Sequence, residues 1–190
     1  VEDKTERHIV DLLPENAITS LPRLVLTNAV YFQGQWDRRF PEETTSSQLF
    51  HKDDGSDVAT DFMNTSGVFN YYAGTGYEVL ELPYKGNDTS MILIGPDAGT
   101  MKRFEATLNP SLVDTAMANL TPTFIDLSMP KFKFSYQLDL TTLLQQLGMT
   151  APFNSQVADF SGINGLKNLF ISDVFHKAFV AVDEEGTEAA

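Results

Sequence analysis

The feature that most constrains the fold is a series of short apolar runs between Gln48 and Pro96, each followed by turn-forming residues. Apolar runs rich in β-branched and aromatic residues and bounded by Gly, Asn, Asp or Pro are typical of antiparallel strands joined by tight turns. The pattern therefore predicts an antiparallel meander. Its predicted strands are Val58–Met63, Val68–Ala73, Tyr77–Tyr84 and Ser90–Ile94, and its predicted turns are Asp53–Gly55, Thr65–Gly67, Gly74–Gly76, Lys85–Asp88 and Gly95–Pro96.

Three further segments also read as strands. Leu24–Phe32 is almost continuously apolar, and Leu169–Val182 is rich in Phe, Ile and Val. A strand that is covered on both faces has this composition. Phe124–Tyr136 instead alternates between apolar and polar residues, which predicts a strand with one buried face.

Three segments have helical spacing. Val1–Leu13 reads as the last part of a helix that Pro14 ends. Asn109 is a cap ahead of an amphipathic helix with Pro110 in its first turn, and a third helix runs from a cap at Asp139 to Gly148. Strands and helices together predict an α+β fold dominated by antiparallel strands.

Charge and composition argue against several classes of partner and site. The chain has 26 Asp and Glu residues against 13 Lys and Arg, a net charge of −13, so it should repel nucleic acid and anionic membrane surfaces. No apolar run approaches the roughly 20 residues of a membrane-spanning helix. The absence of cysteine excludes disulfides, thiolate metal sites and cysteine nucleophiles.

Common catalytic motifs are absent, and the three histidines, His8, His51 and His176, are scattered along the chain. We expect His8 and His51 to be solvated, and His176, which lies in an apolar run, to be a buried, hydrogen-bonded group. No metal site is predicted. The many acidic residues leave open a hydrolase with an unrecognised acid pair. Asn64, Asn87 and Asn119 match the pattern for glycan acceptors.

Four sequence blocks, in this order, resemble the serpin family. They are Asn28–Trp36 with Phe40 behind it, Phe69–Leu82 with Pro83 and Tyr84, Met129–Phe132, and Phe175–Ala190; Asp159–Gly162 is a further serpin-like element. The resemblance extends over essentially all 190 residues.

The resemblance implies a serpin fold, an α+β architecture with large mixed or antiparallel sheets A, B and C and surrounding helices. Residues 1–190 would be part of a single serpin domain, roughly half of it. The N-terminal helices, the scissile bond of the reactive loop and the C-terminal strands would lie outside this chain. The remaining part of the serpin polypeptide would then be an obligatory partner.

The resemblance also implies a function. Serpins of the inhibitory type are suicide substrates of serine proteases: the cleaved reactive loop inserts into sheet A and traps the acyl-enzyme. Such a protein is no enzyme and needs neither catalytic residues nor a cofactor. By position, the reactive-loop hinge would be Glu185, Gly186, Thr187, Glu188, Ala189 and Ala190. The breach region at the top of sheet A would contain Trp36, Lys131 and Glu184, and the shutter at its centre Asn28 and His176.

The hinge residues suit insertion as a strand. Gly186 can change its backbone angles freely as the loop becomes a strand. With a period of two, Thr187 and Ala189 share the inward face, whereas Glu188 and Ala190 share the other, so that the charge faces outward. Small hinge residues favour inhibition over a non-inhibitory role as carrier or chaperone. The family is commonly secreted, and intracellular or bacterial origin is the alternative.

Overall fold

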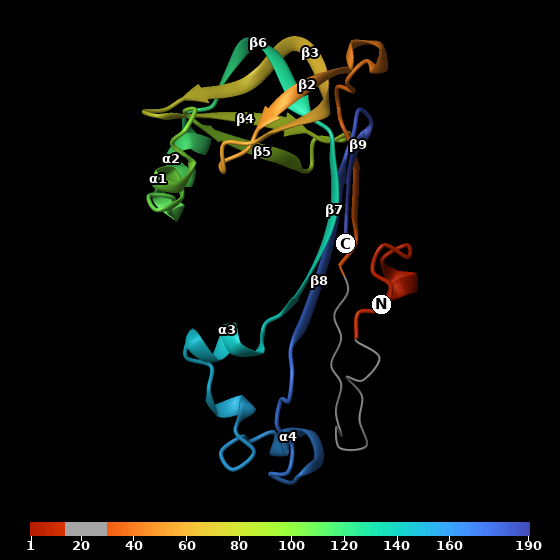
Figure 1. Cartoon of the computed structure of the whole chain (residues 1–190), viewed down its shortest axis with the longest axis vertical. Helices are drawn as coiled ribbons and strands as arrows, with labels where there is room; N and C mark the ends of the chain where they lie inside the picture. The colour runs from red at the N-terminus through yellow and green to blue at the C-terminus, as the bar shows by residue number, and fades with distance from the viewer. Residues whose placement is uncertain (14–29) are drawn as a thin grey trace. The chain divides into compact units, whose positions relative to one another are not determined.

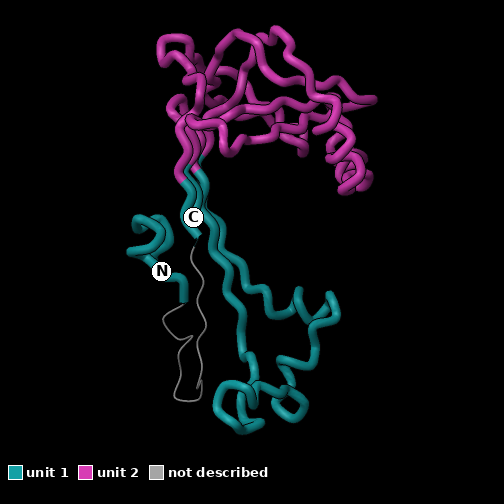
Figure 2. The backbone as a smooth tube through the Cα atoms, turned by 180° about the vertical axis from the view of Figure 1, so that it is seen from behind, with its two compact units in different colours: residues 1–32, 133–180, 188–190 teal, residues 33–132, 181–187 magenta. Residues whose placement is uncertain are grey.

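The structure is a computed structural model that describes residues 1–13 and 30–190. The chain divides into two compact units (Figure 2). Unit 1 consists of Val1–Phe32, Lys133–Val180 and Glu188–Ala190, and unit 2 of Gln33–Phe132 and Ala181–Thr187.

Unit 2 is built on the predicted antiparallel meander. Its five-stranded sheet has the order β2-β3-β4-β5, and β6 also pairs with β3 (Figure 1). All pairs are antiparallel, and three of the predicted turns connect successive strands. The strands are β2 (Ser46–His51), β3 (Asp57–Ala73), β4 (Tyr77–Pro83), β5 (Ser90–Pro96) and β6 (Thr121–Pro130).

The predicted turns at Thr65–Gly67 and Gly95–Pro96 are wrong, because β3 passes through the first as one strand of 17 residues and β5 includes the second. At the first of these, Gly67 leaves room for the tip of the Arg38 side chain. A Cβ atom at this position would lie 1.4 Å from Nη1 of Arg38. The Arg38 guanidinium, which lies 5.4 Å from the centre of the Phe69 ring, therefore occupies the space of the missing side chain. Because β3 has partners along its whole length, all five strands form one hydrogen-bonded sheet.

Two helices, α1 (Met101–Glu105) and α2 (Pro110–Ala118), lie together at one end of this sheet (Figure 1). The predicted cap of α2 is confirmed, since Asn109 Oδ1 accepts a hydrogen bond from the Leu112 amide at 3.0 Å. A short 3-10 helix, η2 (Glu42–Thr44), precedes β2. The buried core of unit 2 includes Met63, Phe69, Val79, Leu80, Leu82 and Met129.

A four-stranded sheet has the order β1-β9-β8-β7, and its strands contain residues of both units. These strands are β1 (Phe32–Gln35), β7 (Phe132–Asp139), β8 (Phe175–Val182) and β9 (Gly186–Ala189). Unit 1 also contains η1 (Glu2–Lys4), α3 (Thr141–Gln146), η3 (Ala151–Phe153) and α4 (Ser161–Asn164). The predicted third helix is confirmed as α3, with Gly148 following at φ 100°. Its predicted cap is wrong by one residue, because the N-cap is Leu140, although Asp139 accepts a hydrogen bond from the Thr141 amide at 2.9 Å.

Two predicted strands are shorter than expected. The alternating run Phe124–Tyr136 is divided at Lys131, whose amide donates to Asp61 O at 2.8 Å, so that β6 and β7 join different sheets. The run from Leu169 becomes a strand only at Phe175. Before that point the Ile171 amide donates to Pro152 O of η3 instead of to a neighbouring strand.

The helix predicted over Val1–Leu13 is wrong. Only Glu2–Lys4 is helical, because Glu6 and Arg7 have φ angles of 47° and 65° that a right-handed helix cannot accommodate. Residues 24–29 of the predicted strand Leu24–Phe32 lie outside the described residues, and of the other three only Phe32 belongs to a strand, β1. None of the helices in the described ranges has the length and apolarity that a membrane span requires.

Candidate functional site at the predicted hinge

A tight turn connects β8 to the predicted hinge. Asp183 Oδ1 accepts hydrogen bonds from the amides of Glu185 (2.9 Å) and Gly186 (3.1 Å), and the Asp183 amide donates to Gly186 O at 3.1 Å. Because an Asp side chain that binds the amides two and three residues ahead stabilises a turn, the chain reverses here. The predicted hinge residues Gly186–Ala189 then form β9, which lies between β1 and β8.

Trp36 donates two hydrogen bonds to the backbone of this turn. Its indole Nε1 donates to Asp183 O at 2.8 Å, and its amide donates to Glu185 O at 2.9 Å. The side chain is 3% exposed and stacks on Tyr84, with 4.8 Å between ring centres. The backbone of the turn is therefore bound to a buried aromatic pair.

Lys131 and Glu184, which were both assigned to the breach, are in contact. Lys131 Nζ lies 2.7 Å from Glu184 Oε2, and the Thr45 hydroxyl donates to the other carboxylate oxygen at 2.7 Å. Burial raises the pKa of Glu184, but the hydrogen bonds from Lys131 and Thr45 outweigh it, so that this pKa is lowered overall. The hydrogen bond to Glu184 raises the pKa of Lys131. Both groups are thus held in their charged forms.

Gly186 is required for a reason that the sequence did not indicate. The sequence predicts that Gly186 serves through its conformational freedom, whereas the structure shows that the backbones of β9 and β1 lie close together at this residue. A Cβ atom on Gly186 would lie 2.0 Å from Gly34 O and 2.9 Å from the Cα atom of Gln35. No side chain fits between β9 and β1 at this point.

Burial along β9 does not alternate as predicted, because Gly186 and Thr187 are both buried and Glu188 and Ala189 are both half-buried. Thr187 is 6% exposed and faces Tyr84, whose pKa is raised by burial and, to a smaller extent, lowered by the Thr187 hydroxyl. Glu188 was expected to project outward. Instead its carboxylate contacts His8 Nε2 at 2.8 Å and accepts a hydrogen bond from the Tyr31 hydroxyl, and its side chain is only 29% exposed.

The shutter residues are not brought together in the described part of the chain. Asn28 lies outside the described residues, and His176 is exposed, so the prediction that it is buried is wrong. On one face of β8, Lys177 donates a hydrogen bond to Val10 O and Phe179 stacks on His8. By alternation, His176 points to the opposite face.

Sequence reasoning missed His8 and Tyr31 as contacts of the hinge. His8 was expected to be solvated, whereas its side chain is 23% exposed and its ring stacks on Phe179, with 4.1 Å between centres. No local pattern could have found this contact, because 180 positions separate His8 from Glu188 in the sequence. His51 is exposed as expected and pairs with Asp57 at 2.6 Å.

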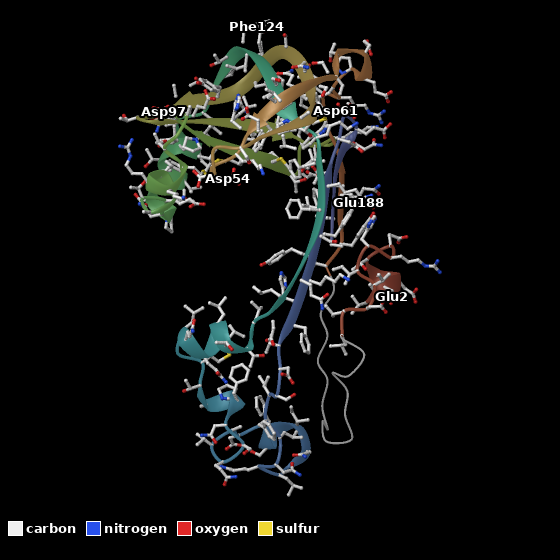
Figure 3. The ribbon with its side chains drawn as sticks, viewed as in Figure 1. Glu2, Asp54, Asp61, Asp97, Phe124 and Glu188 are labelled. Atoms are coloured by element: carbon white, nitrogen blue, oxygen red, sulfur yellow. The ribbon has the colours of Figure 1, made fainter. Side chains whose placement is uncertain are left out.

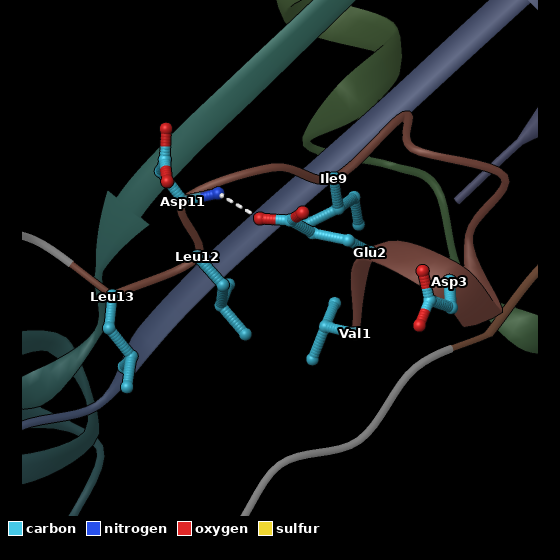
Figure 4. Close-up of a pocket in the computed structure, with 7 residues that line it drawn as sticks. All are labelled: Val1, Glu2, Asp3, Ile9, Asp11, Leu12 and Leu13. Carbon is cyan, nitrogen blue, oxygen red and sulfur yellow. Dashed lines mark hydrogen bonds between the residues drawn. The ribbon is translucent and has the colours of Figure 1, made fainter.

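Metal-binding groups and cavities are the other candidate sites in the described residues. Across residues 1–13 and 30–190, no group of three or more His, Cys, Asp or Glu side chains is arranged to hold a metal ion. A cavity of ≈ 410 Å³ in unit 1 is lined by acidic and apolar residues of the N-terminal segment, including Glu2, Ile9 and Asp11 (Figure 4). The Asp11 amide donates to Glu2 Oε1 across it at 3.3 Å, and the cavity contains no basic or nucleophilic side chain.

Comparison with known proteins identifies the class to which this fold belongs. The family model described as "Serpin (serine protease inhibitor)" matches residues 1–190. The chain belongs to the serpin family.

Individual relatives show how much of a serpin is present. A serpin-like protein of Methanosarcina acetivorans and human antithrombin-III are each 38% identical to the whole chain, which covers 45% and 42% of their lengths. The chain thus spans less than half the length of these relatives.

Solved structures agree on the fold. Emu ovalbumin matches with a TM-score of 0.93 and 27% identity, over 100% of this chain and 50% of its own. Lamprey angiotensinogen with its reaction loop cleaved matches with a TM-score of 0.89 and 28% identity, over 99% of this chain and 57% of its own.

Proposed function

We propose that the protein is a suicide-substrate inhibitor of serine proteases, which traps the acyl-enzyme by inserting its cleaved reactive loop into the four-stranded sheet. The observation that carries this proposal is the position of β9 between β1 and β8. An extended segment gains a full set of backbone hydrogen bonds when it adds to a sheet, and serpin loop insertion uses this source of free energy.

The side chains around β9 support this role. Gly186 and Thr187 are small and buried, as a strand that enters a preformed sheet requires. The Lys131–Glu184 ion pair lies at the start of the segment, next to the turn that Trp36 binds. Within this proposal, Glu185–Ala190 is the hinge, and Trp36, Lys131 and Glu184 form the breach.

The decisive experiment uses the full-length protein. It is incubated with trypsin-like, chymotrypsin-like and subtilisin-like serine proteases, and the products are separated on denaturing gels. A band at the summed mass that survives boiling would demonstrate covalent trapping and name the class of target protease. Cleavage near the loop without such a band for any protease would overturn inhibition in favour of a carrier or chaperone role.

A matched pair of variants tests the hinge itself. Thr187→Arg places a cation at a position of β9 that is only 6% exposed, so insertion should slow and the inhibitor should become a substrate. Thr75→Arg, in the exposed turn between β3 and β4, should trap protease like the wild type. Unchanged trapping by Thr187→Arg would contradict the hinge assignment.

The hydrolase alternative and the location of the protein are tested separately. Turnover of generic glycoside or ester substrates that follows the protein through purification would favour the hydrolase alternative. We also propose that the protein is secreted, as is common in the family, with an intracellular location as the alternative. Fractionation of the source cells distinguishes the two locations.

A further inference from the structure

The side of β9 opposite Thr187 presents the carboxylate of Glu188 to residues 1–13, here called the N-terminal strap, and to Tyr31. Glu188, labelled on β9 in Figure 3, is bound through one oxygen, Oε1. His8 Nε2 lies 2.8 Å from that oxygen, and the Tyr31 hydroxyl donates a hydrogen bond to it. A carboxylate that leaves water is stabilised when charge-assisted hydrogen bonds replace its hydration.

The strap is folded so that it presents His8. Thr5 is completely buried, and its hydroxyl accepts a hydrogen bond from the Ile9 amide at 3.2 Å while its carbonyl accepts from the His8 amide at 2.8 Å. Between them, Glu6 and Arg7 adopt left-handed φ angles of 47° and 65°. Such angles are costly for residues with a Cβ atom, so the turn is maintained by its surroundings.

The strap is also attached to the strand next to β9. The His8 ring stacks on Phe179 of β8, at 4.1 Å and an interplanar angle of 15°. Lys177 of the same strand donates from Nζ to Val10 O at 2.7 Å. The imidazole is therefore held at a fixed place on the sheet, next to the position that Glu188 takes when β9 is present.

The charges around Glu188 favour its ionised form. The hydrogen bond from Tyr31 is the largest influence and lowers the pKa of Glu188, assisted by His8 and Lys133 against the opposing effect of burial. The same hydrogen bond raises the pKa of Tyr31 to about 12, with Glu6 as an additional negative neighbour. Tyr31 thus remains a donor and Glu188 an acceptor over the neutral pH range.

We propose that Tyr31 and His8 form a receptor for the Glu188 carboxylate that retains the hinge in the sheet once insertion has passed Thr187. This inference rests on the proposed function and adds two positioning residues to it. Because the receptor supplies two hydrogen-bonding groups at fixed places, it accepts a carboxylate at position 188. Without the receptor, the segment from Glu188 to Ala190 would separate from β1 and β8 more readily.

The test uses full-length protein whose reactive loop has been cleaved by a protease that it does not trap. Hydrogen exchange of the backbone amides in residues 186–190 is measured by mass spectrometry, since local opening sets the exchange rate of a paired strand. We expect about tenfold faster exchange in Tyr31→Phe, which removes one charge-assisted hydrogen bond, and at least as large an increase in Glu188→Gln, which takes the charge from the contacts with both Tyr31 and His8. The double variant should exchange no faster than Glu188→Gln alone.

Controls separate the receptor from a general loss of structure. Tyr31→Phe keeps the aromatic ring, and Tyr136→Phe removes a hydroxyl from an exposed tyrosine of β7 and should leave exchange unchanged. His8→Gln keeps a donor but loses the stacked ring, and we expect a smaller increase, about threefold.

The outcomes are distinguishable. If residues 186–190 of the cleaved wild-type protein are unprotected, the loop does not insert and the proposed function fails. If these residues are protected in the wild type and equally in Tyr31→Phe and Glu188→Gln, insertion stands and the receptor is refuted. Effects of the two substitutions that add fully in the double variant also refute it, because residues that act through one contact are not additive.

Discussion

Glu184 and Glu188 are four residues apart and are bound in the same chemical manner, yet by different parts of the protein. Each carboxylate contacts one nitrogen group and one hydroxyl, Lys131 and Thr45 for Glu184, His8 and Tyr31 for Glu188. The partners of Glu184 flank the strands of a large antiparallel sheet in unit 2. The partners of Glu188 belong to unit 1, and His8 lies in a segment with left-handed backbone angles.

This difference suggests a division of labour along the hinge. The Glu184 carboxylate is almost entirely removed from water, and the backbone of its turn is bound by Trp36 and Phe40. It is therefore suited to be a permanent anchor. Glu188 keeps more contact with water and has a bound position only when β9 lies in the sheet, which suits a contact that forms during insertion.

The largest expected loss of stability comes from a substitution in the turn that contains Glu184. Gly186→Ala would place a methyl group against Gly34 O, and overpacking of this kind should lower the free energy of unfolding by about 3 kcal/mol. Chemical denaturation of the loop-cleaved full-length protein measures it. Gly162→Ala is the control, because a Cβ atom there meets no other atom within 4 Å. Equal stability of the two variants would show that β1 and β9 are not this close.

The next effect concerns the ion pair. Lys131→Met leaves the Glu184 carboxylate buried without its cation, and we expect a loss of about 2 kcal/mol in the free energy of unfolding, discounted for the partial exposure of Lys131. Lys102→Met, which breaks an exposed pair with Asp53, should cost less than about 1 kcal/mol. If both substitutions cost the same, the Glu184 pair is only a surface contact.

A third prediction concerns Arg7, which precedes His8, one of the partners of Glu188. Arg7→Gly relieves the left-handed backbone and should stabilise the full-length protein by up to about 1 kcal/mol. Arg7→Ala also removes the charge but keeps the Cβ atom, so it should bring no such gain. Thermal unfolding of the three proteins measures the difference. A gain in both variants would assign the effect to charge rather than to backbone geometry.

The smallest effects are those of pH. The lowered pKa values of Glu184 and Glu188 mean that both contacts are complete above the ordinary value of 4.5 and are lost as pH falls through the lowered values. The raised pKa of Tyr31 gives a contribution that is complete below pH 10 and is lost as pH rises through about 12. In Glu188→Gln, tyrosinate absorbance should show Tyr31 titrating closer to its ordinary value of 10. An unchanged titration would exclude the contact.

The sequence was informative where signals are local. Turn residues and alternation predicted β4, β5 and their connection, and Asn109 with Pro110 predicted the start of α2, because these patterns depend only on neighbouring residues. Gly67 misled for the same reason. A glycine that serves a turn and one that admits a distant guanidinium are indistinguishable in sequence.

The candidate site was predictable only through the resemblance to a family. Matching by position placed Trp36, Lys131 and Glu184 together, and the structure brings these three residues into one cluster. It assigned no partner to Glu188, since the contact with His8 joins distant segments and depends on a turn at Glu6 and Arg7 that their residue types disfavour. For His176, an apolar neighbourhood was mistaken for burial.

Trp36 is the single tryptophan of these 190 residues, and its indole nitrogen is bound to the carbonyl of Asp183 at the start of the hinge turn. Indole fluorescence depends on the polarity and hydrogen bonding around the ring. Movement of the turn would expose the ring or change its hydrogen bond, and the emission maximum would shift accordingly. These 190 residues thus contain an intrinsic optical reporter next to the proposed hinge, and under the proposed function its emission would follow the entry of the loop.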